Sequence, residues 1–177
     1  TMDGKILPWL GMKIGEIDNL DQVLIIGSFL RSEAPLLASR FRKAAINGAR
    51  VSMLHAVDDD WLMPVENRLI GSPAKWLPML GEIIAAVAIK KGMPVPDWLG
   101  NLPVTETADR IAASLMDGGN SAIILGAVAV QHEEASALHM AAEWLAGNTG
   151  AKFGVLTGGA NTTGAYLANA FPTPGSG

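Results

Sequence analysis

Two glycine-containing segments that follow apolar runs are the strongest candidates for binding a ligand. The first is Gly27-Ser28, directly after a β-branched run at residues 23–26, and the second is segment 158–164, which contains Gly158, Gly159 and Asn161. Small residues between a strand and a helix could admit a phosphate, because a helix N-terminus offers free backbone N–H groups. The patterns G-x-G-x-x-G and G-x-x-x-x-G-K-[ST] are absent from the chain. Gly27-Ser28 therefore favours an ordinary turn, whereas residues 158–164 could hold a phosphate or pack closely against another domain.

Carboxylates and histidines form two candidate metal sites. Asp58, Asp59 and Asp60 could supply the oxygen ligands that Mg²⁺ prefers, but consecutive side chains point in different directions, which favours an exposed acidic loop. His132 precedes His139 by seven positions. On one helix the two imidazoles would be about 10 Å apart, whereas zinc helices use an i, i+4 pair. We therefore expect His132 and its acidic neighbours to cap a helix and to complement its dipole.

Five tryptophans are many for a chain with 6% aromatic residues. Trp61 and Trp98 stand near prolines in segments without clear periodicity. Exposed tryptophans in such loops would indicate a contact with another protein. Equally, they could cover the edges of a sheet, and the sequence leaves both interpretations open.

The elements that would position these residues alternate between strand and helix. Strands are expected at residues 23–26, 51–55, 121–125 and 152–156, because each is a short apolar run followed by a turn signal. Helices are expected from Pro35 to Asn47, at 75–91, from a cap at Thr105 or Thr107, at 132–146 and at 163–170. Residues 29–34, 58–75 and 93–103 are expected to be loops or irregular.

This order predicts an α/β fold with an open, mostly parallel, doubly wound (Rossmann-like) sheet and helices on both faces. Two βαβ units are expected, at about residues 21–56 and 120–157. We expect residues 1–177 to form a single α/β domain, with a flexible tail at 171–177.

Composition excludes several classes of function. The absence of Cys removes disulfides, thiolate nucleophiles and Cys-ligated iron–sulfur clusters, and the serine-nucleophile pattern G-x-S-x-G is missing as well. A net charge of −4 argues against nucleic acid as a partner. Apolar runs such as residues 83–89 and 122–130 are far shorter than the roughly 20 residues of a membrane span. A charged fraction of 17% fits either a compact α/β core or a piece of a larger assembly.

Several strings resemble one protein family. Residues 21–31 (DQVLIIGSFLR), 35–44 (PLLASRFRKA), 55–64 (HAVDDDWLMP) and 158–168 (GGANTTGAYLA) look like the molybdopterin-oxidoreductase-like subunit of bacterial NADH-quinone oxidoreductase, respiratory complex I. The resemblance covers most of the chain, from about Trp9 to Pro172. It implies that the chain is a fragment of a longer subunit, from a C-terminal region that is similar to molybdopterin oxidoreductases.

The resemblance also implies what this region has lost. In the molybdenum enzymes the first strand typically ends in a Gly-x-Asn-Pro-like loop, and an Asp-Pro-Arg-like motif after the second strand helps to bind the guanine dinucleotide. Here Phe29 stands in place of the Asn, and residues 55–57 or the neighbouring acids replace the second motif. We therefore expect an inherited fold without a cofactor, in which Gly27, Ser28, Gly158, Gly159 and Asn161 are vestigial binding residues. No catalytic or metal-binding residue is expected.

The implied setting is the peripheral arm of complex I. The expected partners are the rest of the parent subunit and other peripheral-arm subunits, on the cytoplasmic side of the bacterial inner membrane, with no direct membrane insertion. Iron–sulfur clusters would be bound by Cys elsewhere in the parent subunit. The alternative is a nucleotide- or pterin-binding Rossmann-like domain of an oxidoreductase, with its site at Gly27-Ser28 and residues 158–164. A third possibility is a stand-alone interaction module that binds through Trp61 or Trp98.

Overall fold

A single parallel sheet forms the centre of the molecule. In the computed structural model, which describes residues 9–100 and 102–156, five strands are arranged in the order β3-β2-β1-β4-β5. The strands are β1 (Gln22–Ile26), β2 (Arg50–His55), β3 (Asn67–Ile70), β4 (Ser121–Leu125) and β5 (Lys152–Val155). Every neighbouring pair is parallel, and Ile26 of β1 is in register with both Leu54 and Leu125. The carboxyl ends of the three central strands therefore meet at one edge of the sheet.

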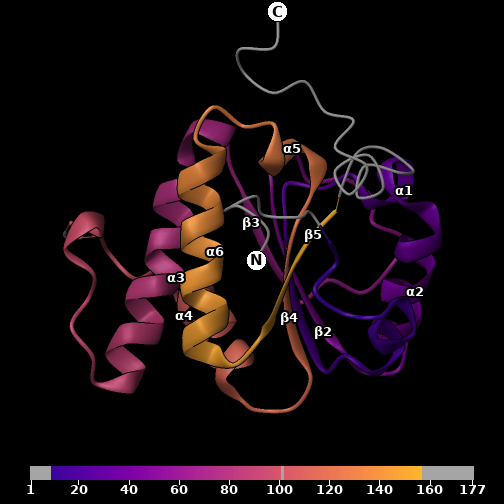
Figure 1. Cartoon of the computed structure of the whole chain (residues 1–177), viewed down its shortest axis with the longest axis horizontal. Coiled ribbons are helices and arrows are strands. Elements are labelled where there is room, and N and C mark those ends of the chain that lie inside the picture. The colour runs from indigo at the N-terminus through magenta and orange to yellow at the C-terminus, as the bar shows by residue number, and fades with distance from the viewer. Residues whose placement is uncertain (1–8, 101, 157–177) are drawn as a thin grey trace, which may run out of the picture.

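Helices cover both faces of this sheet. One face carries α3 (Trp76–Lys91), α4 (Glu106–Met116) and α6 (Ala135–Thr149), and the other carries η1 (Ile14–Asn19), α1 (Leu30–Glu33) and α2 (Pro35–Ile46) (Figure 1). The short helix α5 (Ala127–Val130) lies at the carboxyl edge of the strands. Alternation along β1 divides the core, since Leu24 and Ile26 face α3, α4 and α6 while Val23 and Ile25 face α2.

The predicted fold class is confirmed. All four predicted strands and both βαβ units are present, and the sheet is wholly rather than mostly parallel. The N-cap of α4 is Thr105, whose hydroxyl accepts a hydrogen bond from the N–H of Ala108 at 3.3 Å. The predicted helix at residues 163–170 and the tail at 171–177 lie outside the described residues.

Four local predictions differ from the structure. Residues 58–75 contain the edge strand β3, which has no β-branched run and alternates between buried and exposed positions. Residues 29–34 contain the helix α1 instead of a loop. The helix expected at 132–146 begins at Ala135 and continues through Gly147 and Asn148 to Thr149, because Gly150, with a φ of +77°, makes the left-handed cap. The segment expected to be irregular at 93–103 contains the short turn η3 (Asp97–Leu99).

Candidate functional site

The sheet changes its winding direction between β1 and β4. After β1 the chain passes over one face through α2 to β2, and after β4 it passes over the opposite face through α6 to β5 (Figure 1). In open α/β sheets, ligands bind outside the carboxyl ends of the strands at such a switch point. Gly27 and Ser28 follow β1 at this place, and Gly126 and Ala127 follow β4, so the structure brings the first predicted candidate pair to the switch point.

The two glycines let the backbones of these turns approach closely. Gly27 has a φ of +59°, and a Cβ atom there would lie 2.6 Å from the ring of Trp76. A Cβ at Gly126 would lie 2.2 Å from the Cβ of Ser28. The N–H of Gly126 donates to the carbonyl of Ile26 at 2.7 Å, and the N–H of Val128 donates to the carbonyl of Gly27 at 3.1 Å. Because neither glycine has a side chain, the turns after β1 and β4 pack directly against each other and form the floor of the crevice at the switch point.

The carboxylate of Glu33 fills the position above that floor. It accepts hydrogen bonds from the Ser28 hydroxyl at 2.7 Å, from the N–H of Phe29 at 3.0 Å and from the N–H of Ala127 at 3.3 Å. Ala127 is the first residue of α5, so one carboxylate joins the turn after β1 to the turn after β4. These donors form the kind of cradle that binds a phosphate oxygen at a strand end. Here the chain supplies the anion from α1, and the sequence analysis did not identify it.

Aromatic rings fill the rest of the strand ends. His55, at the end of β2, is 1% exposed, and its ring centroid lies 4.3 Å from Phe29, 5.1 Å from Trp61 and 6.2 Å from Trp76. Trp76 in turn stacks on His132, with centroids 5.7 Å apart. Burial lowers the pKa of the His55 imidazole below its usual range, although the Val57 carbonyl, Glu33 and Asp59 act against that shift. A neutral His55 thus sits in a mainly apolar cluster.

A pocket of about 570 Å³ opens beside this cluster. Its lining includes Glu33, Ala127, His132 and Glu133, together with Pro73 at the start of η2 (Pro73–Lys75). The pocket therefore carries two carboxylates and no lysine or arginine among the described residues that line it. This charge suits a neutral or cationic group better than an anion.

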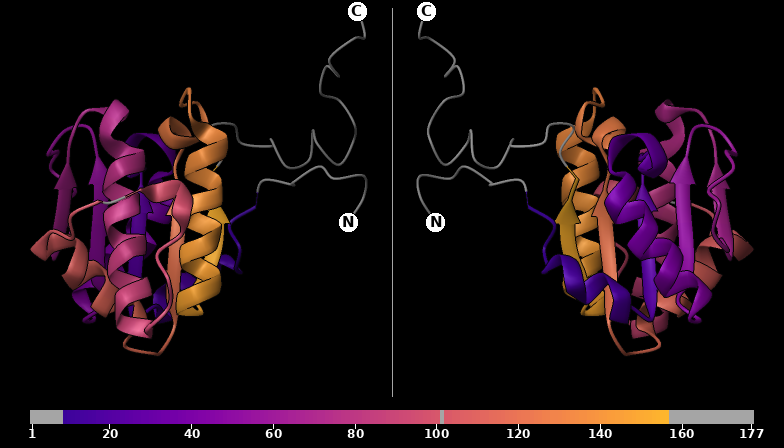
Figure 2. Two further views of the ribbon diagram at one scale, coloured as in Figure 1. Left: turned by 90° about the vertical axis from the view of Figure 1, so that its left-hand side faces the viewer. Right: turned by 90° about the vertical axis from the view of Figure 1, so that its right-hand side faces the viewer.

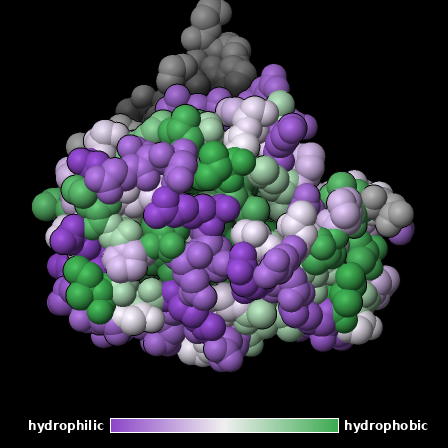
Figure 3. Space-filling view, turned by 180° about the vertical axis from the view of Figure 1, so that it is seen from behind, coloured by the Kyte–Doolittle hydropathy of each residue, from purple (hydrophilic) through white to green (hydrophobic). Residues whose placement is uncertain are grey.

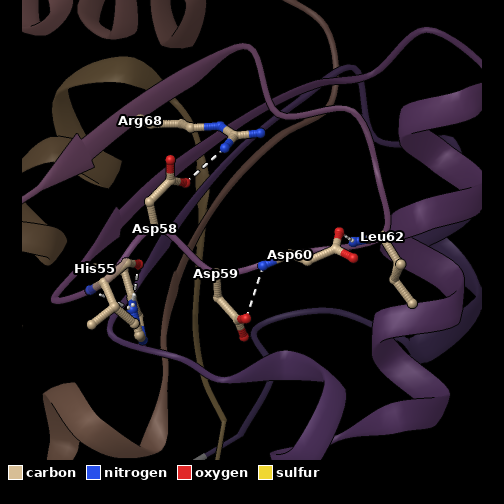
Figure 4. Close-up of polar contacts among 7 residues, drawn as sticks. His55, Asp58, Asp59, Asp60, Leu62 and Arg68 are labelled. Atoms are coloured by element: carbon tan, nitrogen blue, oxygen red, sulfur yellow. Dashed lines mark hydrogen bonds and ion pairs between the residues drawn. The ribbon is translucent and has the colours of Figure 1, made fainter.

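The three aspartates after β2 do not converge on one point. Asp58 forms an ion pair with Arg68 at 2.6 Å, Asp59 accepts from the N–H of Asp60 at 2.8 Å, and Asp60 accepts from the N–H of Leu62 at 3.0 Å (Figure 4). No group of three or more His, Asp or Glu side chains that could hold a metal ion exists in the described part of the chain. The acidic loop is thus tied to its own backbone and to Arg68.

The two histidines of the second candidate metal site are separated. His132 precedes α6, and its Nδ1 accepts from the N–H of Glu134 at 3.0 Å. Glu134 is the N-cap of α6, which has no side-chain cap, so the prediction that His132 or its neighbours cap this helix was wrong. His139 lies within α6, 3.6 Å from the carboxylate of Glu143. The prediction that His132 lies on the same helix was wrong.

The tryptophans divide between core and surface. Trp61 is 4% exposed, so the interpretation of an exposed contact residue was wrong for it, whereas Trp98 is 56% exposed. Trp98 belongs to the connection between α3 and α4. Apolar side chains, drawn in green, gather on the surface at this connection in the space-filling view (Figure 3). The predicted residues Gly158, Gly159 and Asn161 lie outside the described part of the chain, so their relation to the switch point stays a prediction.

Comparison with known proteins adds a family match. The model of the molybdopterin oxidoreductase family matches residues 2–176. A search of curated proteins gives no significant match. No helix among the described residues is long and apolar enough to cross a membrane. The family match spans all five strands and the switch point.

Proposed function

The chain belongs to the molybdopterin oxidoreductase family, and we propose that it is a non-catalytic structural domain that has lost the family's cofactor. We further propose that its parent is the molybdopterin-oxidoreductase-like subunit in the peripheral arm of NADH:quinone oxidoreductase, complex I. In this role the domain stabilises the subunit beside the electron-transfer chain. Its partners are the rest of that subunit and the neighbouring peripheral-arm subunits, on the cytoplasmic side of the membrane.

The hydrogen bonds that Glu33 accepts are the observation that best supports loss of the cofactor. A dinucleotide form of the cofactor would bring a pyrophosphate to the switch point, where Ser28, Phe29 and Ala127 already donate to the Glu33 carboxylate. Two like charges about 4 Å apart repel by roughly 1 kcal/mol in water and about 4 kcal/mol at the effective dielectric of a protein surface. The described residues therefore do not fit a pyrophosphate at this position.

The aromatic cluster supports the same conclusion independently. Phe29, His55 and Trp61 occupy the strand ends beside the crevice, with ring centroids only 4.3 and 5.1 Å from that of His55. A flat base or pterin placed over the ends of β1 and β2 would have to displace these buried rings and expose their apolar surface to water. Neither obstacle depends on the other, because one is electrostatic and the other is steric.

The assignment to a complex I subunit has its support in the sequence. The strings at residues 21–31, 55–64 and 158–168 carry the resemblance. The absence of Cys also fits a domain that lies outside the path of the electrons, because the clusters of that subunit need thiolate ligands. The gene that encodes this sequence tests the assignment. A longer reading frame with a Cys-rich region before this segment supports the complex I parent, and a frame without one contradicts it.

Loss of the cofactor can be tested on the purified chain. The chain is expressed in bacteria with intact molybdopterin synthesis, and molybdenum is measured by mass spectrometry and pterin by fluorescence after oxidation. Both should be far below one equivalent per chain. Stoichiometric molybdenum or pterin would overturn the proposal.

The alternative function is a nucleotide- or pterin-binding domain of an oxidoreductase. The pocket of about 570 Å³ at the switch point favours it by its size, although the two carboxylates in its lining suit the neutral ring of a base or pterin and not a phosphate. A thermal-shift screen with nucleotides and pterins separates the two functions. A rise of several degrees with one of these ligands would indicate binding to the folded chain and favour the alternative.

A further inference from the structure

The outer face of α2 carries an unusual combination of exposed apolar and basic side chains. Its inner residues, such as Phe41, are buried against the sheet, whereas Leu36 is 83% exposed and Ile46 is 62% exposed. The helix lies at the front of the molecule in the right-hand view of Figure 2. We call this surface the α2 face. It includes two flanking hollows, one beside Arg31 and Arg42 and the other beside Arg40 and Lys43.

Positive charge is concentrated on the α2 face of an acidic chain. Four cations belong to α1 and α2, and they are Arg31, Arg40, Arg42 and Lys43. Arg40 and Lys43 share a single carboxylate, that of Asp18, at 3.1 and 2.8 Å.

The other two arginines have no carboxylate partner among the described residues. Arg31 donates to the carbonyl of Asp60 at 2.7 Å, and Arg42 donates to the carbonyl of Leu62. The carboxylate of Asp60, in the same loop, is engaged by the N–H of Leu62. Among the described residues, these four cations therefore have one ion-pair partner, the carboxylate of Asp18, although the whole chain has a net charge of −4.

Two hollows lie on either side of Ser39, which lines both of them. The first, of about 280 Å³, is lined by Arg31, Arg42 and Trp61 among others. The indole N–H of Trp61 is buried and has no hydrogen-bond partner in the described structure. The second hollow, of about 490 Å³, is lined by Ile14, Leu36, Arg40 and Lys43, and also by Asp18, whose carboxylate pairs with both of these cations. Each hollow therefore combines cationic groups with an apolar wall.

We propose that the α2 face binds an acidic segment of a partner protein. A carboxylate of that segment enters the first hollow beside Arg31 and Arg42, and an apolar side chain of the segment covers Leu36 at the second. The charge excess supplies attraction and orientation, and the exposed leucine supplies apolar area that is buried on binding. This proposal goes beyond the structural role and holds whether or not the parent is complex I.

A protein segment fits the α2 face better than a membrane or a nucleic acid. Leu36 and Ile46 are ten residues apart, about 15 Å along the helix, and Ser39 and Lys43 separate them. An interfacial membrane helix needs a continuous apolar stripe instead. Nucleic acid requires a larger excess of cations than these four, two of which already pair with Asp18.

The test uses the full chain and a short synthetic amphipathic peptide that alternates Glu and Leu at helical spacing. Binding is followed by fluorescence anisotropy of the labelled peptide. A matched peptide with Gln in place of every Glu should bind at least about tenfold more weakly, which corresponds to about 1.4 kcal/mol. Leu36→Glu should cause a loss of similar size, because it adds a carboxylate where the peptide's apolar side chain lies.

Met140→Glu is the matched control, since Met140 is 63% exposed on α6, over the opposite face of the sheet. It should leave peptide binding unchanged, and circular dichroism should show both variants folded.

No binding of the Glu peptide, or equal binding to wild type and Leu36→Glu, overturns the proposal. Binding to vesicles of anionic lipid that Leu36→Glu abolishes would overturn it by assigning the face to a membrane. A dimer that dissociates in Leu36→Glu would overturn it by assigning the face to a second copy of the chain.

Discussion

Removing the Glu33 carboxylate should destabilise the fold measurably. In Glu33→Ala the Ser28 hydroxyl and the N–H groups of Phe29 and Ala127 lose their acceptor together. A fully buried donor without a partner costs about 1–3 kcal/mol. These donors are only partly buried, and the adjacent pocket admits water, so the lower value applies and the expected loss is about 3 kcal/mol in total. For a chain of this length the loss corresponds to a Tm lower by roughly 6–12 °C.

The same variant should acquire affinity for small anions. The three donors that Glu33 releases point at the two oxygens of one carboxylate, and two oxygens of a phosphate group can accept from them in its place. Inorganic pyrophosphate at about ten times its Kd would then restore roughly 1.4 kcal/mol of stability. Wild type should show no such rise, because its own carboxylate occupies the position.

Urea unfolding followed by circular dichroism measures the loss, and thermal shift with pyrophosphate measures the rescue. The control is Glu106→Ala, whose side chain is 86% exposed in the first turn of α4 and which should cost less than about 0.5 kcal/mol. If Glu33→Ala is as stable as this control, Glu33 is a surface residue in solution and the argument for an occupied crevice fails. A thermal shift of equal size in wild type would refute it as well.

Three further predictions concern the strand ends. Gly27→Ala should cost about 3 kcal/mol or more in urea unfolding, because it combines a positive φ with a Cβ 2.6 Å from Trp76, whereas Gly15→Ala, with open space around it, should be nearly neutral. Trp61→Ala should cost about 3–5 kcal/mol as a cavity mutation, and Trp98→Ala, at a site that is 56% exposed, about 1 kcal/mol or less by the same assay. Burial lowers the pKa of His55 in the folded chain, so the unfolded chain binds the proton more tightly. The stabilising contribution of neutral His55 should therefore be complete above about pH 6.5, and the free energy of unfolding should fall as the pH drops below that value. His55→Phe should flatten that fall in unfolding curves recorded across this pH range.

The fold was predictable wherever a local pattern matched its final environment. β1 and β4 are buried at every position, and such strands read as continuous apolar runs in the sequence. β3 is an edge strand with alternating exposure, and its Asn67 and Arg68 resemble a turn when read alone. Gly147 failed as a stop signal because a helix packed against a sheet tolerates a glycine at a cost of only about 1 kcal/mol.

The position of the candidate site was predictable from the sequence, but the side chain that fills it was not. Gly27-Ser28 was recognised because a small residue follows a buried strand, and the switch point lies there. The role of Glu33 depends on Ala127, which is 94 positions away, and on α1, which residues 29–34 did not reveal. A sequence motif describes what a ligand needs from the chain. It does not describe a side chain of the protein that takes the ligand's place.

The presence of an internal anion is a stronger sign of a lost cofactor than the absence of a motif. A missing glycine or arginine only weakens binding, and other residues can compensate for it. Glu33 makes the fold itself depend on hydrogen bonds that a phosphate would otherwise receive. Phe29 and Trp61 around His55 add a steric obstacle that Glu33→Ala leaves intact. That variant should therefore bind pyrophosphate without preferring a guanine nucleotide over it, since the rings still cover the ends of β1 and β2 where a base would stack.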